Sequence, residues 1–155
     1  MTGTFDLEDF LPYLLNQAAD TLSLKFQRHY KARYGILRTE WRVLFHLGRY
    51  GPLTATEICD RARLHKTKVS RAVAALERKR FLARRESKQD RRQSILALTR
   101  QGRAAFDDLH AAARAFDAEI QADFTREEAA ILHDCLVRIA GIRRTKDGTG
   151  QAPER

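Results

Sequence analysis

The stretch TATEICDRARLHKTKVSRAVAALERKRFLARRESKQDRRQSILALT, residues 54–99, decides the fold of this chain. Its first four residues, Thr54–Glu57, have the spacing of a capping box that opens a short helix with Ile58 and Ala62 turned inward. After Leu64 a second helical pattern runs from about Lys66 to Lys79, and its apolar side consists of Val69, Ala72, Val73 and Leu76. Two short helices with a tight connection predict a helix-turn-helix.

The spacing of apolar residues then changes from helical to strand-like. Residues 81–86 and 93–99 are runs of strand length, and Leu96 and Leu98 alternate with Ile95 and Ala97, which suits a hairpin packed on helices. Residues 87–92 between the two runs form a polar, basic tip. A helix-turn-helix followed by a basic hairpin predicts a winged helix.

Helical patterns occupy most of the remaining chain. Apolar residues recur at helical spacing over residues 12–34, and Gly35 ends the pattern. A second helix is expected after Thr39 as N-cap and ends at Gly51-Pro52. Beyond the hairpin a long helix should reach about Asp123, and a capping box at residues 125–128 should open a last helix over 126–144 with Ala129, Leu132, Leu136 and Ile139 inward. The fold class is therefore mainly α with a small β-hairpin wing.

The chain reads as a single domain, residues 1–155, with three kinds of segment. Residues 36–99 form the winged helix, residues 11–34 and 100–144 form long dimerisation helices, and 145–155 form a flexible polar tail after a short arm at 1–10. The apolar stripes Leu11–Leu22 and Leu132–Ile139 exceed what one winged helix can bury. A symmetric homodimer is the simplest way to cover them.

Charge is unevenly distributed along the 155 residues. The net charge is +9, and residues 61–92 contain thirteen Lys and Arg against three Asp and Glu, whereas the remaining residues nearly balance. A basic segment on a near-neutral body indicates a nucleic-acid contact, although a solvated charged face is the simple alternative. The longest apolar run has five residues, Ala72–Leu76, and the first basic residue is Lys25, so neither a transmembrane helix nor a secretory signal is expected. We therefore expect a cytoplasmic protein with no membrane partner.

Patterns of catalytic or metal-binding residues do not stand out. The chain has no GxSxG, phosphate-loop or HExxH pattern, and its five His do not pair at metal-ligand spacing with a carboxylate. Cys59 and Cys135 lie far apart in helical patterns, which favours core thiols over a redox role. We therefore expect that the protein is not an enzyme and that it binds neither a metal ion nor a cofactor.

The second helix of the helix-turn-helix has one face that suits DNA. Its exposed side carries Ser and Thr hydroxyl groups and Arg71, whose guanidinium can form a bidentate contact with guanine. Lys66 and Lys68 can bind phosphates. At the tip of the wing, Arg92 suits a minor groove, and Asp90 is either its orienting partner or a plain turn residue. The predicted DNA contacts are Thr54, Lys66, Thr67, Lys68, Ser70, Arg71, Arg84, Lys88, Asp90, Arg91 and Arg92.

From about residue 11 to 143 the chain resembles the MarR family of transcriptional regulators. The motif that carries the resemblance is Asp90-Arg-Arg92 followed by Leu98-Thr99 and Gly102, which is similar to the family's D-x-R…L-T-x-x-G. Supporting matches are Leu53–Glu57 and Lys66–Arg71, and the opening Leu11–Asn16 looks like that of members that respond to aromatic compounds. The resemblance implies a repressor released from a pseudo-palindromic operator by a small ligand that shifts the population of its states.

One residue departs from the family pattern. His65 stands where the family usually has Ser or a similar cap, so the entry to the helix could differ, or the imidazole could add a pH-sensitive phosphate contact.

A candidate ligand site lies where the first two helices meet. An apolar wall with a few polar donors is typical of small-molecule sites, although these side chains could equally be core and solvated helix end. The predicted ligand contacts are His29, Tyr30, Arg33, Trp41 and Phe45.

Two other functions stay open at this point. A redox regulator of the same fold would use Cys59 or Cys135, and an architectural protein would bind nucleic acid without regard to sequence. The sequence does not specify the operator, the effector, the regulated genes or whether the protein represses or activates.

Overall fold

The computed structural model describes residues 5–142. The chain folds into two compact units, the first reaching His110 and the second beginning at Ala111. The elements of the first unit, in chain order, are η1(Leu7–Asp9), α1(Leu11–Tyr34), α2(Arg38–Tyr50), β1(Leu53–Thr54), α3(Ala55–Ala62), α4(Lys66–Arg78), β2(Leu82–Glu86) and β3(Ser94–Leu98). The helix α5(Arg100–Gln121) passes from the first unit into the second, which also contains α6(Arg126–Ala140).

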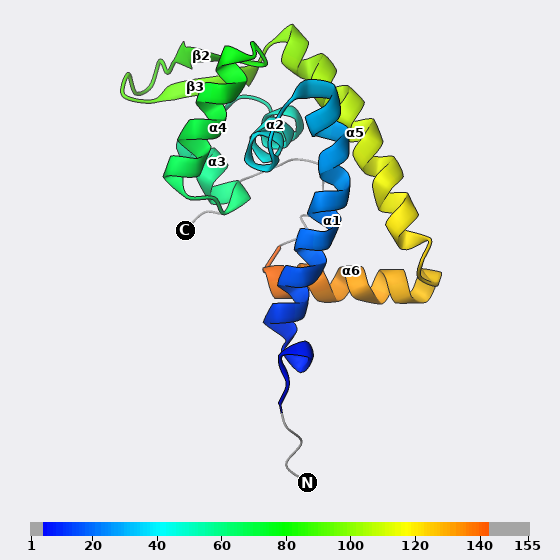
Figure 1. The fold of residues 1–155 in the computed structure, drawn as a ribbon. Coiled ribbons are helices and arrows are strands. Elements are labelled where there is room, and N and C mark those ends of the chain that lie inside the picture. Colours follow the sequence, from blue (N-terminus) through cyan, green and yellow to red (C-terminus); the bar gives the residue numbers. More distant parts are fainter. Residues whose placement is uncertain (1–4, 143–155) are drawn as a thin grey trace. The chain divides into compact units, whose positions relative to one another are not determined.

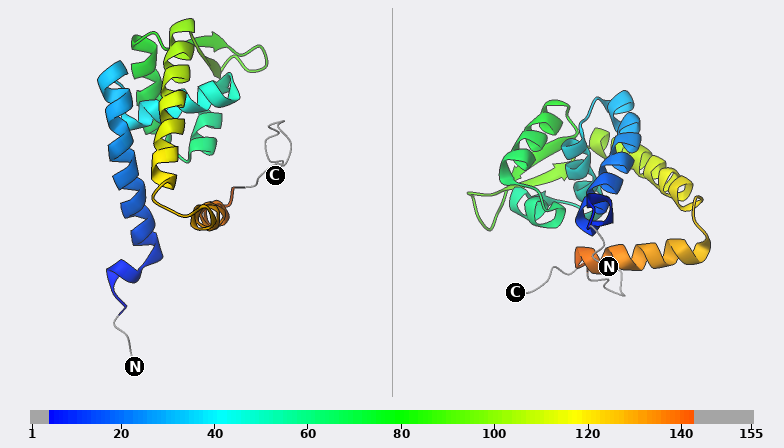
Figure 2. Two further views of the ribbon diagram at one scale, coloured as in Figure 1. Left: turned by 90° about the vertical axis from the view of Figure 1, so that its right-hand side faces the viewer. Right: turned by 60° about the horizontal axis from the view of Figure 1, so that its bottom comes forward.

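The helices α2, α3 and α4 pack together against a small antiparallel sheet with the order β1-β3-β2 (Figure 1). Both views of Figure 2 show the β2–β3 hairpin projecting away from the helices. The predicted winged helix is thus confirmed, together with the mainly α fold class. Sequence reasoning missed β1, a two-residue strand in which Leu53 pairs with Leu96 of β3.

The core of the first unit is built from the apolar faces of these elements. The inward positions expected for α3 and α4 are buried, and α2, the sheet and the first half of α5 add large side chains. Glu40 is the one charged residue buried there among those described, and its carboxylate accepts the backbone N–H of Leu37. The fully buried large side chains include Ile36, Val43, Leu44, Leu47, Ile58, Val69, Val73, Leu76, Leu96 and Leu109.

Several predicted helix boundaries need correction. Thr39 is not the N-cap of the second helix: α2 begins at Arg38, and Leu37 precedes it with an extended backbone. Glu40 at the third helical position satisfies the N–H of Leu37 from inside the helix, so an apolar residue is tolerated as N-cap. The last helix ends at Ala140 with Gly141 in the left-handed conformation, earlier than predicted. Residues 143–155, including the predicted tail, lie outside the described part.

The two predicted apolar stripes are exposed to solvent in the single chain. On α6 the exposed fractions of Leu132, Leu136 and Ile139 are 42%, 41% and 54%, so these residues do not face inward as expected. On α1 the exposed fractions of Leu11 and Leu14 are 52% and 45%. Each stripe therefore carries large apolar side chains that are exposed in the single chain, although Leu15 and Leu22 on α1 are half-buried.

Candidate nucleic-acid interface

The helix α4 has one buried and one exposed face. Its buried face holds it against α2 and α3, which fixes the orientation of the other face. The exposed face carries five of the predicted DNA contacts, namely Lys66, Thr67, Lys68, Ser70 and Arg71, while Ala74 in the next turn is half-buried. Because all five lie in the first two turns, they can enter a groove together.

The N-cap of α4 is His65. Its backbone is extended, and its Nδ1 accepts a hydrogen bond of 3.2 Å from the backbone N–H of Thr67. A ring nitrogen that accepts is unprotonated, so the other nitrogen, Nε2, carries the hydrogen in this arrangement. His65 therefore begins the helix as a Ser would, although through a larger side chain.

The wing is a hairpin of two five-residue strands, and hydrogen bonds within its tip hold the turn. Ser94 to Leu98 pair with Leu82 to Glu86 in antiparallel register. At the tip the backbone N–H of Ser87 donates to the carbonyl of Gln93 at 3.2 Å. The predicted contacts Lys88, Arg91 and Arg92 are exposed on this tip.

The structure assigns Asp90 a turn-forming contact. Its Oδ1 accepts the backbone N–H of Arg92 at 2.9 Å, a side-chain bond two residues along the chain that closes a local turn. Among the ion pairs of residues 5–142 none involves Asp90. Asp90 thus shapes the tip through the backbone, and the guanidinium of Arg92 is not paired with it.

Two further predicted contacts, away from the tip, also have partners within the chain. Thr54 is the N-cap of α3: its hydroxyl accepts the N–H of Glu57, and the Glu57 carboxylate accepts the N–H of Thr54. Arg84 on β2 forms an ion pair of 2.9 Å with Glu77 of α4. The structure therefore brings nine predicted contacts to the exposed surface of α4 and the wing tip and leaves these two engaged elsewhere.

A single residue joins the wing to α5. The hydroxyl of Thr99 donates to the carbonyl of Arg80 at 2.6 Å and accepts the N–H of Gly102 at 3.0 Å. Gly102 lies so close to Phe81 that a Cβ would overlap the carbonyl oxygen of Phe81. The L-T-x-x-G part of the motif therefore packs the end of the sheet against the start of α5.

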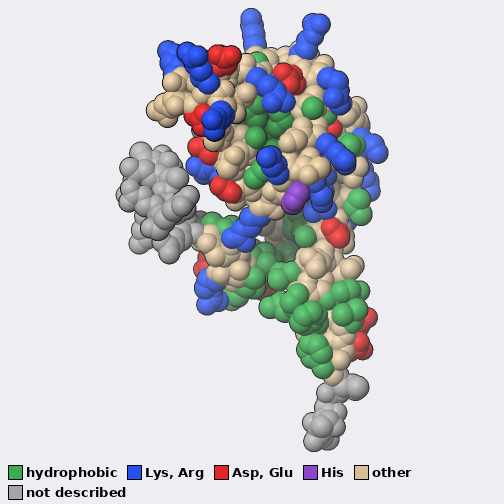
Figure 3. Space-filling view, turned by 90° about the vertical axis from the view of Figure 1, so that its left-hand side faces the viewer, with side chains coloured by type: hydrophobic (Ala, Val, Ile, Leu, Met, Phe, Trp, Pro, Cys, Tyr) green, Lys and Arg blue, Asp and Glu red, His purple; other side chains and the backbone are tan. Residues whose placement is uncertain are grey.

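Lys and Arg side chains are numerous on the side of the first unit from which the wing projects. Figure 3 shows this side, where basic groups are spread over the surface together with a few acidic ones. From residue 61 to residue 76 the sequence contains no Asp or Glu. A surface of this kind attracts the phosphate backbone of a nucleic acid.

The residues predicted to bind a ligand form an aromatic cluster between α1 and α2. Tyr30 stacks on Trp41 with ring centroids 5.9 Å apart, and Phe45 meets Trp41 edge to face at 5.3 Å. Phe26, which the prediction did not include, contacts His29, Tyr30 and Trp41. Tyr30 is only 1% exposed and is part of the core.

Arg33, which was also predicted to bind the ligand, is paired with a carboxylate of α5. Its guanidinium is 3.0 Å from both carboxylate oxygens of Asp108 on α5, and the hydroxyl of Tyr34 donates to the same carboxylate at 2.7 Å. These hydrogen bonds hold the pKa of Asp108 below its usual value, while burial and Asp108 raise the pKa of Tyr34. Sequence reasoning missed this network because Asp108 lies 75 residues away from Arg33.

His46 on α2 is half-buried and lies close to arginines of α2 and α3. The Nδ1 of His46 lies 2.6 Å from the carbonyl oxygen of Arg42, and Arg42 donates to the carbonyl of Ala62. Burial lowers the pKa of His46, and the charges of Arg42 and Arg61 lower it further, against the opposing effect of the hydrogen bond. Arg61 lies over the ring of Tyr50 at 4.3 Å. This cluster ties α2 to α3.

The cysteines are half-buried, which corrects the expectation that both are core thiols. The sulfur of Cys135 lies 3.5 Å from a guanidinium nitrogen of Arg138. Within residues 5–142 no group of three His, Cys, Asp or Glu side chains is placed to hold a metal ion. No helix of this part is long and apolar enough to cross a membrane.

Comparisons with known proteins agree with this architecture. Residues 34–93 match the model of the MarR family. The HTH-type transcriptional repressor MdtR of Bacillus subtilis is 30% identical over 96 residues, which are 62% of either chain. A MarR/EmrR family transcriptional regulator from Acinetobacter sp. ADP1 has a similar structure, with a TM-score of 0.79 at 25% identity over 88% of this chain and 96% of that chain.

A further similar structure is that of BpsR from Bordetella bronchiseptica, whose DNA binding is regulated by 6-hydroxynicotinic acid. Its TM-score is 0.78 at 18% identity, over 92% of this chain and all of that chain, a likeness of fold. The exposed basic face of α4 and the hairpin define a DNA-binding protein of the winged helix-turn-helix class. Over this winged-helix part, residues 34–93, the chain matches the MarR family of transcriptional regulators.

Proposed function

We propose that this regulator is a homodimeric repressor that binds a pseudo-palindromic operator and leaves it when a small aromatic ligand binds. The observation that carries the proposal is that nine residues predicted to contact DNA are exposed on α4 and the wing tip, which are held in place by the buried face of α4 and a hydrogen-bonded turn. The role of repressor is supported by the name of the relative MdtR. Two copies of α4 related by a two-fold axis would read two half-sites.

The exposed stripes support the homodimer. Leu11 and Leu14 on α1 and Leu132, Leu136 and Ile139 on α6 expose apolar side chains along more than one helical turn. Monomeric proteins rarely leave apolar surface of this extent in contact with water. A second copy of the chain supplies identical stripes that can cover them.

The aromatic ligand is supported by the cluster between α1 and α2. Trp41 and Phe45 are half-buried there, and His29 is half-buried beside Phe26. The regulation of BpsR by 6-hydroxynicotinic acid is an example of an aromatic acid acting on a regulator of this fold. His29 and Arg33 are the basic side chains of the predicted site that could bind the carboxylate of such a ligand, and Arg33 also binds Asp108.

Selection of DNA by the protein itself tests the function. Duplexes with a random central region are bound, recovered and sequenced over several rounds. The enriched sequences should contain an inverted repeat with half-sites about one helical turn apart. Arg71→Ala should weaken binding to the selected duplex by about 1–3 kcal/mol and relax the preference at one position.

The same experiment has a matched control. Arg126→Ala removes an exposed arginine from α6, outside the proposed interface, and should leave affinity for the selected duplex unchanged. Arg92→Ala should mainly reduce the dependence of affinity on salt, by about one unit of slope. Wild-type protein that enriches no sequence over random duplex would instead be a sequence-indifferent binder, and the proposal would be wrong.

The fluorescence of Trp41 tests the ligand, because it is the only tryptophan. Aromatic acids, beginning with 6-hydroxynicotinic acid, are titrated while emission and affinity for the selected duplex are followed. Saturable quenching together with weaker DNA binding is the expected result. Ligand-induced release that persists unchanged in Trp41→Phe and His29→Ala would place the ligand site elsewhere.

A further inference from the structure

Two arginines in the described part of the chain have a left-handed backbone, and they flank α4. Arg63, with φ of 51°, ends α3 and precedes α4, and Arg80, with φ of 62°, follows α4. Both occupy the same kind of helix end. The N–H of the next residue, Leu64 or Phe81, bonds back to a carbonyl five residues earlier. Glycine is the usual residue at such a position, because a Cβ disfavours the left-handed conformation.

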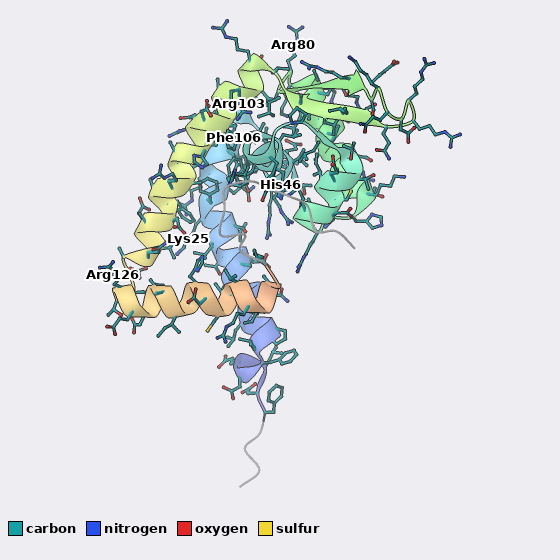
Figure 4. All side chains as sticks on the ribbon, turned by 180° about the vertical axis from the view of Figure 1, so that it is seen from behind. Lys25, His46, Arg80, Arg103, Phe106 and Arg126 are labelled. Atoms are coloured by element: carbon teal, nitrogen blue, oxygen red, sulfur yellow. The ribbon has the colours of Figure 1, made fainter. Side chains whose placement is uncertain are left out.

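The surroundings of the two arginines differ. Arg63 lies in the connection that leads directly into the exposed face of α4, inside the acid-free stretch 61–76. Arg80 lies beyond the far end of α4, a helix of thirteen residues and therefore about 20 Å long. Glu77 and Glu86 lie close to Arg80 in sequence, and its carbonyl holds Thr99. Figure 4 labels Arg80 near the start of α5, next to the sheet.

We infer that Arg63 is a further DNA contact, binding a phosphate that flanks the groove into which α4 enters. Its side chain is exposed, and only two residues separate its Cα from that of Lys66, the first residue of α4. A docked α4 brings the preceding connection close to the backbone of one strand, where a guanidinium binds phosphate oxygens. The inference rests on the proposed DNA binding and adds one contact to that interface.

Because Arg63 and Arg80 have a left-handed backbone, replacing either by Gly tests the side chain without disturbing the backbone. In most positions, replacing Arg by Gly removes the side chain and also loosens the backbone. At Arg63 and at Arg80, Gly adopts the existing backbone without strain. Arg63→Gly and Arg80→Gly are therefore a matched pair that removes equal charge and leaves both helix ends intact.

Binding of the full-length variants to the selected duplex is measured by fluorescence anisotropy at several salt concentrations, with thermal unfolding recorded in parallel. Arg63→Gly should reduce the slope of log affinity against log salt by about 0.9, which corresponds to about fivefold weaker binding at 0.15 M salt. Arg80→Gly should bind with the wild-type affinity and slope. Arg63→Lys should keep the wild-type slope, because the charge remains. The unfolding curves should show that each variant is folded at the temperature of the binding measurement.

Each other outcome would overturn the inference in its own way. Wild-type affinity and slope in Arg63→Gly would mean that no phosphate is bound. Weaker binding with an unchanged slope would mean that Arg63 only positions α4. An equal loss of slope in Arg80→Gly would mean a general effect of net charge. If Arg71→Ala weakens binding while Arg63→Gly does not, the proposed function stands and only this contact fails, whereas a wild type that binds no duplex removes both.

Discussion

At the scale of single residues, Gly102 lies directly against the backbone of Phe81. A Cβ at this position would overlap the carbonyl oxygen of Phe81, which is backbone and cannot rotate away. Gly102→Ala should therefore lower the free energy of unfolding by about 2–3 kcal/mol, although Ala favours helix over Gly. Urea unfolding measures the change. Gln101→Ala on the exposed side of the same turn should change stability by less than about 0.5 kcal/mol, and equal values for the two variants would refute the close contact.

His46 gives the stability of the protein a dependence on pH. Burial and the charges of Arg42 and Arg61 lower its pKa in the folded state below the ordinary value of 6.5. The unfolded chain therefore binds more protons as the pH falls through 6.5, and stability is lost on that side. His46→Gln should flatten the change in unfolding free energy between about pH 7.5 and 5.5. A wild-type pH profile in His46→Gln would show that other groups produce the dependence.

At the scale of elements, His65 shows how an unusual residue can serve an ordinary purpose. Its Nδ1 accepts the N–H of Thr67, so removal of the ring leaves that donor without its partner at the start of α4. His65→Ala should destabilise the protein by about 0.5–1 kcal/mol, while His65→Ser should preserve the wild-type stability because its hydroxyl also caps a helix. Urea unfolding at neutral pH distinguishes the two. Equal destabilisation by Ala and Ser would show that the ring acts through packing instead of capping.

Elements with strong local signals were predicted from the sequence. The capping boxes at Thr54 and Thr125 mark the starts of α3 and α6, and the change of spacing after residue 80 marks the hairpin. The start of α2 was not predicted, because Glu40 caps it from within and leaves no Ser, Thr or Asp before it. The strand β1 was not predicted either, because two residues carry no periodic signal and pair with a strand 43 positions away.

The candidate site could be predicted only in part. The exposed face of α4 follows from helical periodicity, since its buried residues repeat at three and four positions. The ion pairs Arg33–Asp108 and Arg84–Glu77 depend on tertiary packing that spacing does not encode. Asp90 is an example. The sequence left two roles open, an orienting partner of Arg92 or a turn residue, and the bond from the backbone N–H of Arg92 to Asp90 supports the turn residue.

At the scale of the whole molecule, the exposed stripes of α1 and α6 predict that stability depends on protein concentration. A homodimer held by these stripes dissociates on dilution, and the midpoint of thermal unfolding then falls. Leu136→Glu should produce monomers or insoluble protein in sedimentation at micromolar concentration, because it places a charge in the shared apolar surface.

The control for Leu136→Glu lies on the same helix. Ala130 is exposed and lies on the other side of α6 from Leu132 and Leu136 at 100° per residue, so Ala130→Glu should remain dimeric. A wild-type chain that sediments as a monomer at micromolar concentration would contradict the homodimer itself.

The connection between β3 and α5 has a fixed length of one residue. Thr99 alone separates the end of β3 at Leu98 from the start of α5 at Arg100. One inserted residue would advance every later residue of α5 by about 100° around the helix axis. The carboxylate of Asp108 would then replace the buried Leu109 in the core. Among related chains, insertions and deletions should therefore occur at the wing tip, residues 87–93, and be absent between Leu98 and Gly102, which an alignment of their lengths can test.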